Sequence, residues 1–165
     1  MSDGLTQFVP HVYRLSLRLT SDPHRAEDLT QETFLRAWKS RGTLKNEQAT
    51  RVWLFRIAAN LWKDELRRKS PASAGSQLLS DEVDGSAVAP DRRLEDEDEL
   101  AQALRLLDRL PPRQRTVLYL AAVEELSLSE ICEILEIDKN TAKVNLSLAR
   151  KRMREELAKR IRNAQ

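Results

Sequence analysis

The sequence predicts an all-α protein built from two small helical domains that an acidic linker joins. Apolar residues recur three and four positions apart through both halves of the 165-residue chain, which is typical of helices packed on a core. No segment shows the sustained alternation of apolar and polar residues that a half-buried strand needs. Residues 70–92, rich in Ser, Pro, Gly and acidic residues, bury too little apolar surface to offset their ordering entropy. We therefore place the domains at 1–69 and 93–165.

Three helices are predicted in the first domain. Apolar residues at helical spacing predict a first helix over 5–21. Asp22 is a suitable N-cap for a second helix over about 22–38, and Pro23 fits its first turn, where a missing N–H costs little. A third, longer helix follows over about 49–68.

Four helices are predicted in the second domain. The first two span about 93–109 and 113–123, with two prolines between them. Ser127 and Glu130 fit a capping box that opens the next helix. A short turn then leads to a last helix capped by Asp138. Two helices joined by so short a turn are typical of a helix-turn-helix.

The net charge of +2 conceals a strong pattern along the chain. Residues 1–70 contain 13 Lys/Arg and 8 Asp/Glu (+5), residues 71–99 contain 2 and 9 (−7), and residues 100–165 contain 13 and 9 (+4). Two basic ends therefore flank an acidic middle. Basic modules favour phosphate partners, although plainly solvated basic helices would show the same charge.

Several protein classes are disfavoured. No run of about 18 apolar residues is present, so we expect no membrane insertion. Cys132 has no second cysteine to pair with, and with two histidines it makes a poor metal site. We expect no metal, no cofactor and a reducing, cytoplasmic location. No Gly-rich phosphate loop, HExxH motif or supported Ser/His/Asp set is found, so we predict that the chain is not an enzyme.

The predicted helix over 22–38 has two unlike sides. At 100° per residue, its apolar side gathers Ala26, Leu29, Phe34 and Ala37. Its opposite side gathers Asp28, Gln31, Glu32, Leu35 and Arg36. This second side is either a solvated face or a docking surface on which Leu35 is an exposed apolar anchor.

The third helix mixes aromatic residues with cations. The aromatic residues are Trp53, Phe55 and Trp62, and the cations are Arg51, Arg56, Lys63, Arg67, Arg68 and Lys69. Such a mixture suits single-stranded nucleic acid, because bases stack on rings while cations pair with phosphates. The rings could instead fill the core of a three-helix domain. We favour the core for Trp53 and Phe55 and leave both roles open for Trp62.

The last helix offers the most informative surface. Its apolar side, expected to pack on the preceding helix, contains Ala142, Leu146, Ala149 and Met153. In a helix-turn-helix, the N-terminal part of the second helix faces base edges in the major groove. The side chains best placed to reach those edges are Lys139, Asn140, Lys143, Val144 and Ser147. Arg150, Lys151 and Arg154 would hold phosphates; a plain amphipathic helix is the alternative.

Together these motifs resemble those of one known family, the extracytoplasmic-function (ECF, group IV) sigma factors of bacterial RNA polymerase. Region 2.2 is resembled by Asp28-Leu29-Thr30-Gln31-Glu32-Thr33-Phe34-Leu35-Arg36-Ala37-Trp38. Regions 2.3 and 2.4 are resembled by residues 53–58 with Asn60, Asp64 and Arg67. Region 4 is resembled by Leu110-Pro111, Arg115, Ser129-Glu130-Ile131, Thr141, Lys143, Leu146, Ala149 and Arg150. The likeness covers nearly the whole chain except the linker.

The resemblance implies a sigma region 2 helical bundle at 1–69, a flexible acidic linker at 70–92 and a sigma region 4 helix-turn-helix at 93–165. The second domain would sit on the flap of core RNA polymerase, and the linker would thread polymerase channels. The residues that would dock on the clamp helices of the largest subunit are Asp28, Gln31, Glu32, Leu35 and Arg36.

The resemblance also implies contacts with promoter DNA and with a regulator. A non-template base of the −10 element would be flipped out into the loop over 41–48. The single strand beside it would meet Asn60, Lys63, Arg67 and Arg68. The duplex −35 element would meet Lys139, Asn140, Thr141, Lys143, Val144, Ser147, Arg150 and Lys151. An anti-sigma factor is expected as a further partner, contacting Val144 and Leu148.

The helix-turn-helix departs from the family's usual pattern, because Glu136 stands where a glycine is common. Val144 and Leu148 lie one helical turn apart and are expected to point outward. We therefore predict an unusual duplex readout that relies on Lys143, Ser147 and apolar contact through Val144. Two other functions stay open: a helix-turn-helix regulator that does not join polymerase, and a sigma-like adaptor that never engages DNA.

Overall fold

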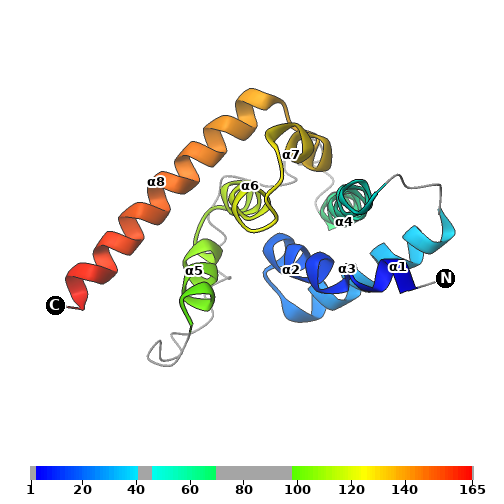
Figure 1. Cartoon of the computed structure of the whole chain (residues 1–165), viewed down its shortest axis with the longest axis horizontal. Helices are drawn as coiled ribbons and strands as arrows, with labels where there is room; N and C mark the ends of the chain where they lie inside the picture. The colour runs from blue at the N-terminus through cyan, green and yellow to red at the C-terminus, as the bar shows by residue number, and fades with distance from the viewer. Residues whose placement is uncertain (1–2, 41–45, 70–97, 165) are drawn as a thin grey trace.

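The computed structural model describes residues 3–40, 46–69 and 98–164, and every regular element in these ranges is a helix (Figure 1). The helices are α1 (Asp3–Thr6), α2 (Val9–Thr20), α3 (Pro23–Lys39), α4 (Glu47–Lys69), α5 (Glu99–Asp108), α6 (Pro112–Ala122), α7 (Leu128–Leu135) and α8 (Lys139–Asn163). The predicted all-α fold class is confirmed. The predicted linker over 70–92, and residues 41–45 of the expected −10 loop, lie outside the described residues.

The first predicted helix is in fact two helices, α1 and α2. Pro10 stands in the first turn of α2 and has no N–H to donate to the carbonyl of Thr6, so a continuous helix is broken there. The N–H of Phe8 donates instead to the carbonyl of Leu5 at 3.0 Å. Leu5 and Phe8 are nevertheless both buried. The prediction of one helix over 5–21 is therefore wrong about the backbone but right about the apolar face.

Helices α2, α3 and α4 pack on one another around an apolar core. Phe34 enters it from α3, and Phe55 and Trp62 enter it from α4. Phe55 is fully buried and Trp62 is only 5% exposed, while Trp53 is partly buried against the same core. The core interpretation of Trp53 and Phe55 is thus confirmed, and Trp62 also belongs to the core.

Polar caps begin the helices at the predicted residues. The Asp22 carboxylate accepts from a first-turn N–H of α3 at 2.9 Å, and the Asp138 carboxylate accepts from one of α8 at 2.7 Å. Ser127 and Glu130 form the predicted capping box of α7. Asp98 caps α5, which begins one residue later, whereas the predicted start near residue 93 lies outside the described ranges.

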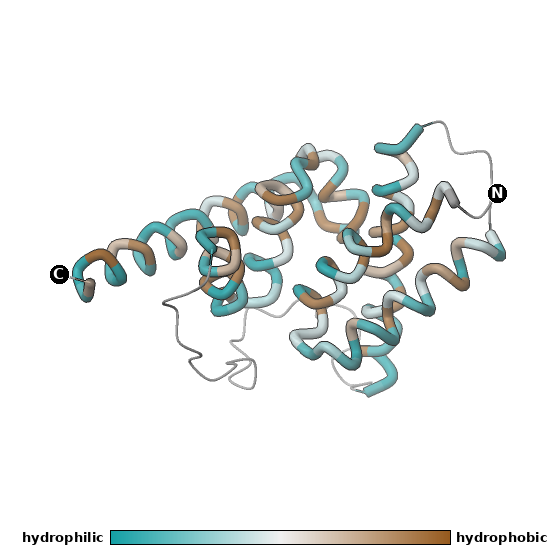
Figure 2. The backbone as a smooth tube through the Cα atoms, turned by 60° about the horizontal axis from the view of Figure 1, so that its bottom comes forward, coloured by the Kyte–Doolittle hydropathy of each residue, from teal (hydrophilic) through white to brown (hydrophobic). Residues whose placement is uncertain are grey.

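The two halves of the chain pack directly on each other. Helix α2 lies against α6, and α4 lies against α7 (Figure 1). One continuous set of buried apolar residues extends from Val12 and Leu15 of α2 to Tyr119 and Leu120 of α6. Figure 2 shows apolar segments gathered where helices meet, and mixed colouring along the C-terminal part of α8, which extends past this core.

Candidate nucleic-acid interface

The outward side of α3 is exposed along its length. It contains all five predicted docking residues, Asp28, Gln31, Glu32, Leu35 and Arg36. The Arg36 Nε atom lies 3.4 Å from Glu32 Oε1, so these two charges partly satisfy each other. Leu35 is 48% exposed, and Trp38, to which sequence reasoning gave no separate role, is 45% exposed beside it. Large apolar side chains surrounded by polar ones are typical of a surface that a partner protein covers.

The predicted −10 residues of α4 do not share one environment. Asn60 and Lys63 are partly buried, whereas Arg67 and Arg68 are exposed near the C-terminal end of the helix. The Lys63 ammonium lies 2.5 Å from a carboxylate oxygen of Glu136, which belongs to the other half of the chain. Only the C-terminal part of the predicted surface is therefore open.

Three carboxylates of the helix-turn-helix face α4, and we call them the α7 acidic row: Glu130, Glu133 and Glu136. Their spacing of three residues places them along one side of the helix. The contacts are Gln48 Nε2 to Glu130 Oε2 at 2.7 Å, Arg56 Nη1 to Glu133 Oε1 at 3.4 Å, and Lys63 Nζ to Glu136 Oε2 at 2.5 Å. Sequence reasoning missed this row as a functional element. The acidic spacing was visible, but nothing local indicated that α4 would lie opposite it.

Glu136 ends α7 in a left-handed backbone conformation, with φ 55° and ψ 48°. Glycine or asparagine is the usual residue at such a position, because a Cβ atom is crowded there and costs roughly 1–2 kcal/mol. The Glu136 N–H donates to the carbonyl of Cys132, which closes the helix end. The Glu136 carboxylate accepts a hydrogen bond from the Lys63 ammonium at 2.5 Å.

Two carboxyl groups of the α7 acidic row have lowered pKa values. A hydrogen bond from Lys63 and the charge of its ammonium lower the pKa of Glu136 below its ordinary value. The backbone N–H of Ser127, donated within the capping box, lowers the pKa of Glu130. Both groups are therefore held in the charged form, which is the form that pairs with cations.

A buried carboxylate, Glu124, joins the two halves within the same interface. It is only 2% exposed. The Tyr119 hydroxyl donates to Glu124 Oε1 at 2.9 Å, Arg51 Nη1 lies 3.3 Å from Oε2, and His11 Nδ1 lies 3.0 Å from Oε2. These partners come from α6, α4 and α2. A buried charge satisfied by so many partners is expensive to disturb, so Glu124 fixes how the halves pack.

Arg18 forms a second buried connection between the halves. Its guanidinium donates to both carboxylate oxygens of Asp108, at 2.8 and 3.0 Å, and lies 5.5 Å from the Tyr119 ring centroid. Arg115 Nε donates to the Arg18 carbonyl at 2.9 Å. Burial raises the pKa of Asp108, although the charges of Arg18 and Arg115 act in the opposite direction. This cluster ties α2 to α5 and α6.

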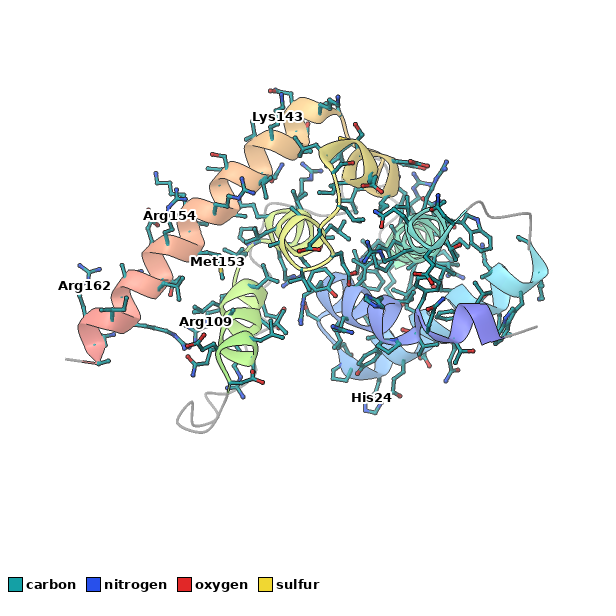
Figure 3. All side chains as sticks on the ribbon, viewed as in Figure 1. His24, Arg109, Lys143, Met153, Arg154 and Arg162 are labelled. Carbon is teal, nitrogen blue, oxygen red and sulfur yellow. The ribbon has the colours of Figure 1, made fainter. Side chains whose placement is uncertain are left out.

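The outer side of α8 is open to solvent. The exposed members of the predicted −35 set are Lys139, Asn140, Lys143, Val144, Ser147, Arg150 and Lys151, while Thr141 is partly buried. Figure 3 shows Lys143 on the outer side of the helix and Met153 on the side that faces α6 and α5. The backbone N–H of Thr141 lowers the pKa of Asp138, the cap at the start of this surface. Val144 and Leu148 are 48% and 41% exposed, as expected from their spacing.

Asn145 faces the opposite way. It is 6% exposed, and its side-chain amide donates to the Thr141 carbonyl at 2.8 Å. The predicted apolar side is buried around it, with Ala142 and Ala149 fully covered. Asn145 is therefore not among the exposed polar side chains of the outer set.

The second half also has an apolar groove between α5, α6 and α8. It encloses about 320 Å³, and its lining includes Leu100, Leu104, Leu118, Met153 and Leu157. Leu100 and Leu157 are 58% and 46% exposed, so the groove opens to solvent at that end. Arg150 and Arg154 contribute to its lining, which places positive charge beside the apolar surface.

Among the residues that the structure describes, no group of three or more His, Cys, Asp or Glu side chains is placed to hold a metal ion. None of the helices described is long and apolar enough to cross a membrane.

Comparison with known proteins gives matches on both halves. Residues 5–71 match Sigma-70 region 2, and residues 100–153 match Sigma-70 region 4. The ECF RNA polymerase sigma factor SigW of Bacillus subtilis is 32% identical over 154 residues, which cover 88% of this chain and 82% of that protein. SigM, an ECF sigma factor of the same bacterium, is 30% identical over 89% of this chain and 88% of that protein.

A solved structure has a similar fold. It is the sigma factor RpoE in complex with the anti-sigma factor NepR from Bartonella quintana, with a TM-score of 0.68 and 25% identity over 94% of this chain and 95% of that one. The similarity to relatives thus extends through both halves and is more than a shared helix-turn-helix. With its all-helical fold and its two matched regions, this chain belongs to the ECF sigma factors of bacterial RNA polymerase.

Proposed function

We propose that the chain binds core RNA polymerase and directs it to promoters by recognising −10 and −35 elements, acting in the cytoplasm and catalysing no reaction itself. Residues 1–69 would form the polymerase-binding and −10 module, and residues 93–165 the −35 module, with 70–92 between them. The observation that carries the proposal is the exposed side of α3, where Leu35 and Trp38 are open to solvent in a chain matched to sigma regions on both sides.

Docking would use the outward side of α3 on the clamp helices of the largest polymerase subunit. Leu35 would be the buried anchor, and the surrounding set of Asp28, Gln31, Glu32 and Arg36 would form the polar rim. Such an arrangement concentrates binding energy in a desolvated centre. The second half would sit on the flap, to which the apolar groove between α5, α6 and α8 offers a ready surface.

The −10 element would be held as a single strand along α4. Trp62 is buried in the core, which leaves Asn60 and the cations Lys63, Arg67 and Arg68 as the contacts of this helix. Cations alone hold phosphates without reading sequence, so capture of a flipped base is assigned to the loop over 41–48, of which 41–45 lie outside the described residues.

The −35 element would be read as duplex by the outer side of α8. The Asp138 cap fixes the start of the helix, so its first turns can enter the major groove. Lys143, Ser147 and Val144 would contact base edges, the last through a thymine methyl group, with Lys139, Asn140 and Thr141 nearby. Arg150 and Lys151 would hold phosphates. The apolar contact through Val144 makes this proposed recognition of the −35 element unusual.

An anti-sigma factor is proposed as the controlling partner. Support comes from the related RpoE structure, whose partner is the anti-sigma factor NepR. On this chain the exposed apolar pair Val144 and Leu148 is the contact that we propose, because covering it would also block duplex reading. Pull-down from resting native cells should then return a partner other than polymerase subunits.

The test is co-migration of the purified chain with core polymerase in gel filtration at low salt. Leu35→Asp should abolish co-migration, because a carboxylate cannot be desolvated in the contact centre. Ile161→Asp is the matched control, since Ile161 is 63% exposed at the far end of α8 and should leave binding unchanged. Absence of wild-type binding would overturn the assignment and favour a regulator that acts without polymerase.

A further inference from the structure

We propose that the apolar groove between α5, α6 and α8 binds a single-chain anionic amphiphile, such as a medium-chain fatty acid. Its hydrocarbon chain would lie in the groove and its carboxylate on Arg154. The site does not depend on the proposed function. The two meet in one consequence, because a groove filled in this way would not be open to the polymerase flap.

The first support is the size and composition of the groove. Its volume of about 320 Å³ lies at the lower end of the range for small-molecule pockets, which is roughly 300–1,000 Å³. Nine of its eleven lining residues are apolar, and the other two are Arg150 and Arg154. An apolar wall with a small number of charged groups is typical of pockets that bind and orient a small molecule.

The second support is the difference between the floor of the groove and its rim. Leu107 and Leu118 are buried and form the floor, whereas Leu100 and Leu157 are about half exposed and form the rim. A hydrocarbon chain laid along these side chains would leave water, while a charged head group at the open end would stay hydrated. The groove therefore suits a molecule with one apolar part and one charged part.

The third support is that the two arginines have no acidic partner. Arg150 and Arg154 are exposed and lie one turn apart on α8, and no residue three or four positions from either one is acidic. Within the described residues no carboxylate pairs with either guanidinium, whereas Lys159, farther along α8, lies 3.4 Å from Glu156.

Two neighbouring cations beside an apolar surface favour an anionic ligand, since a guanidinium can bind a carboxylate through two hydrogen bonds. Arg150 is also proposed to hold a −35 phosphate. Arg154 is therefore the cation that we assign to the head group.

The test is isothermal titration calorimetry of the full chain with dodecanoate, kept below its critical micelle concentration. Dodecyltrimethylammonium, which has a similar chain and a cationic head group, is the control ligand. Vesicles of phosphatidylglycerol test for a membrane surface instead. We expect saturable binding of one dodecanoate per chain and much weaker binding of the cation. No dodecanoate binding, equal binding of the cation, or binding of vesicles without dodecanoate binding would each overturn the proposal.

Two variants locate the site. Leu157→Asp places a carboxylate on the rim and Arg154→Gln removes the cation, and both side chains are exposed, so the fold is expected to survive. Each should weaken dodecanoate binding about tenfold, because the first sets a charge beside the hydrocarbon chain and the second removes a charge-assisted hydrogen bond. The matched controls are Val9→Asp on α2 and Arg152→Gln on α8, both exposed and outside the groove lining.

The four variants decide where the ligand lies. Weaker binding in the two groove variants, with the controls unchanged, would support the proposed site. Equal affinities in all four would show that dodecanoate binds elsewhere and would overturn it. Co-migration with core polymerase is measured separately without dodecanoate, so a failure of this proposal is distinguishable from a failure of the proposed function.

Discussion

Helices α4 and α8 are both expected to bind promoter DNA, but the structure presents them differently. Three cations of α4 face carboxylates from the other half of the chain, namely Arg51, Arg56 and Lys63, whereas Arg67 and Arg68 are exposed. Those of α8, such as Lys143, project outward into solvent. A basic helix face is therefore defined by what lies opposite it as much as by its own residues. We expect the two surfaces to respond differently to the same kind of substitution.

The largest expected effect comes from breaking the packing that covers α4. Glu124→Ala removes the partner of His11, Arg51 and Tyr119 in a buried site. Loss of one member of a buried charged network costs about 3–5 kcal/mol of unfolding free energy. Urea denaturation measures this loss. The exposed control Glu155→Ala should change stability by less than about 0.5 kcal/mol, and an equally small loss for Glu124→Ala would contradict its role.

The next effect concerns the open surface of α8. Lys143→Ala should reduce the preference for the −35 element by about 1–3 kcal/mol, or roughly fivefold to 150-fold, because one base contact is lost. Lys151→Ala should instead weaken binding to all duplexes alike, since a phosphate contact reads no sequence. Binding to a promoter-mutation series distinguishes the two. An unchanged −35 preference in Lys143→Ala would show that the readout lies elsewhere.

A smaller effect is expected from two substitutions at Glu136, which distinguish the strain of its backbone from the loss of its charge. Glu136→Gln keeps the strained left-handed backbone and loses the ion pair with Lys63, whereas Glu136→Gly loses the pair but relieves the backbone. The glycine variant should be more stable than the glutamine variant by about 1 kcal/mol. Equal stabilities in urea denaturation would mean that the turn is not strained.

The smallest effect is a pH dependence. Lowered pKa values at Glu130, Glu136 and Asp138 mean that the folded state holds these groups charged more strongly than the unfolded state does. Their stabilisation is present above their ordinary pKa values and is lost as pH falls through the lowered ones. Because the pKa of Asp108 is raised in the folded state, this group instead favours the folded state as the pH falls.

The pH dependence is measured by urea denaturation between neutral and acidic pH. Glu136→Gln should show a shallower loss of stability on acidification, by less than about 1 kcal/mol because the side chain is half exposed. If the free energy of unfolding of Glu136→Gln falls with pH as steeply as that of the wild type, Glu136 does not contribute to the pH dependence.

Features set by neighbouring residues could be predicted from the sequence. The caps at Asp22, Ser127 and Asp138 need only a polar side chain and the next turn of helix, and the structure confirms all three. The two-sided character of α3 and α8 likewise follows from helical spacing. Even the break before α2 had a local signal, because Pro10 removes an N–H. The unbroken apolar pattern nevertheless predicts one continuous helix over 5–21.

Features set by packing between the halves could not be predicted. Nothing near Glu124 or Arg18 in the sequence indicates partners that lie 73–113 residues away. The burial of Trp62 depends on how α4 meets α2 and α3, so aromatic and basic composition alone left its role open. The contacts of the α7 acidic row join residues 73–82 positions apart, so nothing local in the sequence indicates them.

The most direct test of the account is run-off transcription with core RNA polymerase on a randomised promoter library. It asks whether this chain converts core binding into selective initiation. We predict transcripts that require the chain and that arise from templates sharing two short sequence blocks, one at −35 and one at −10. Binding to core polymerase without any chain-dependent transcript would contradict the account and indicate an adaptor that never opens a promoter.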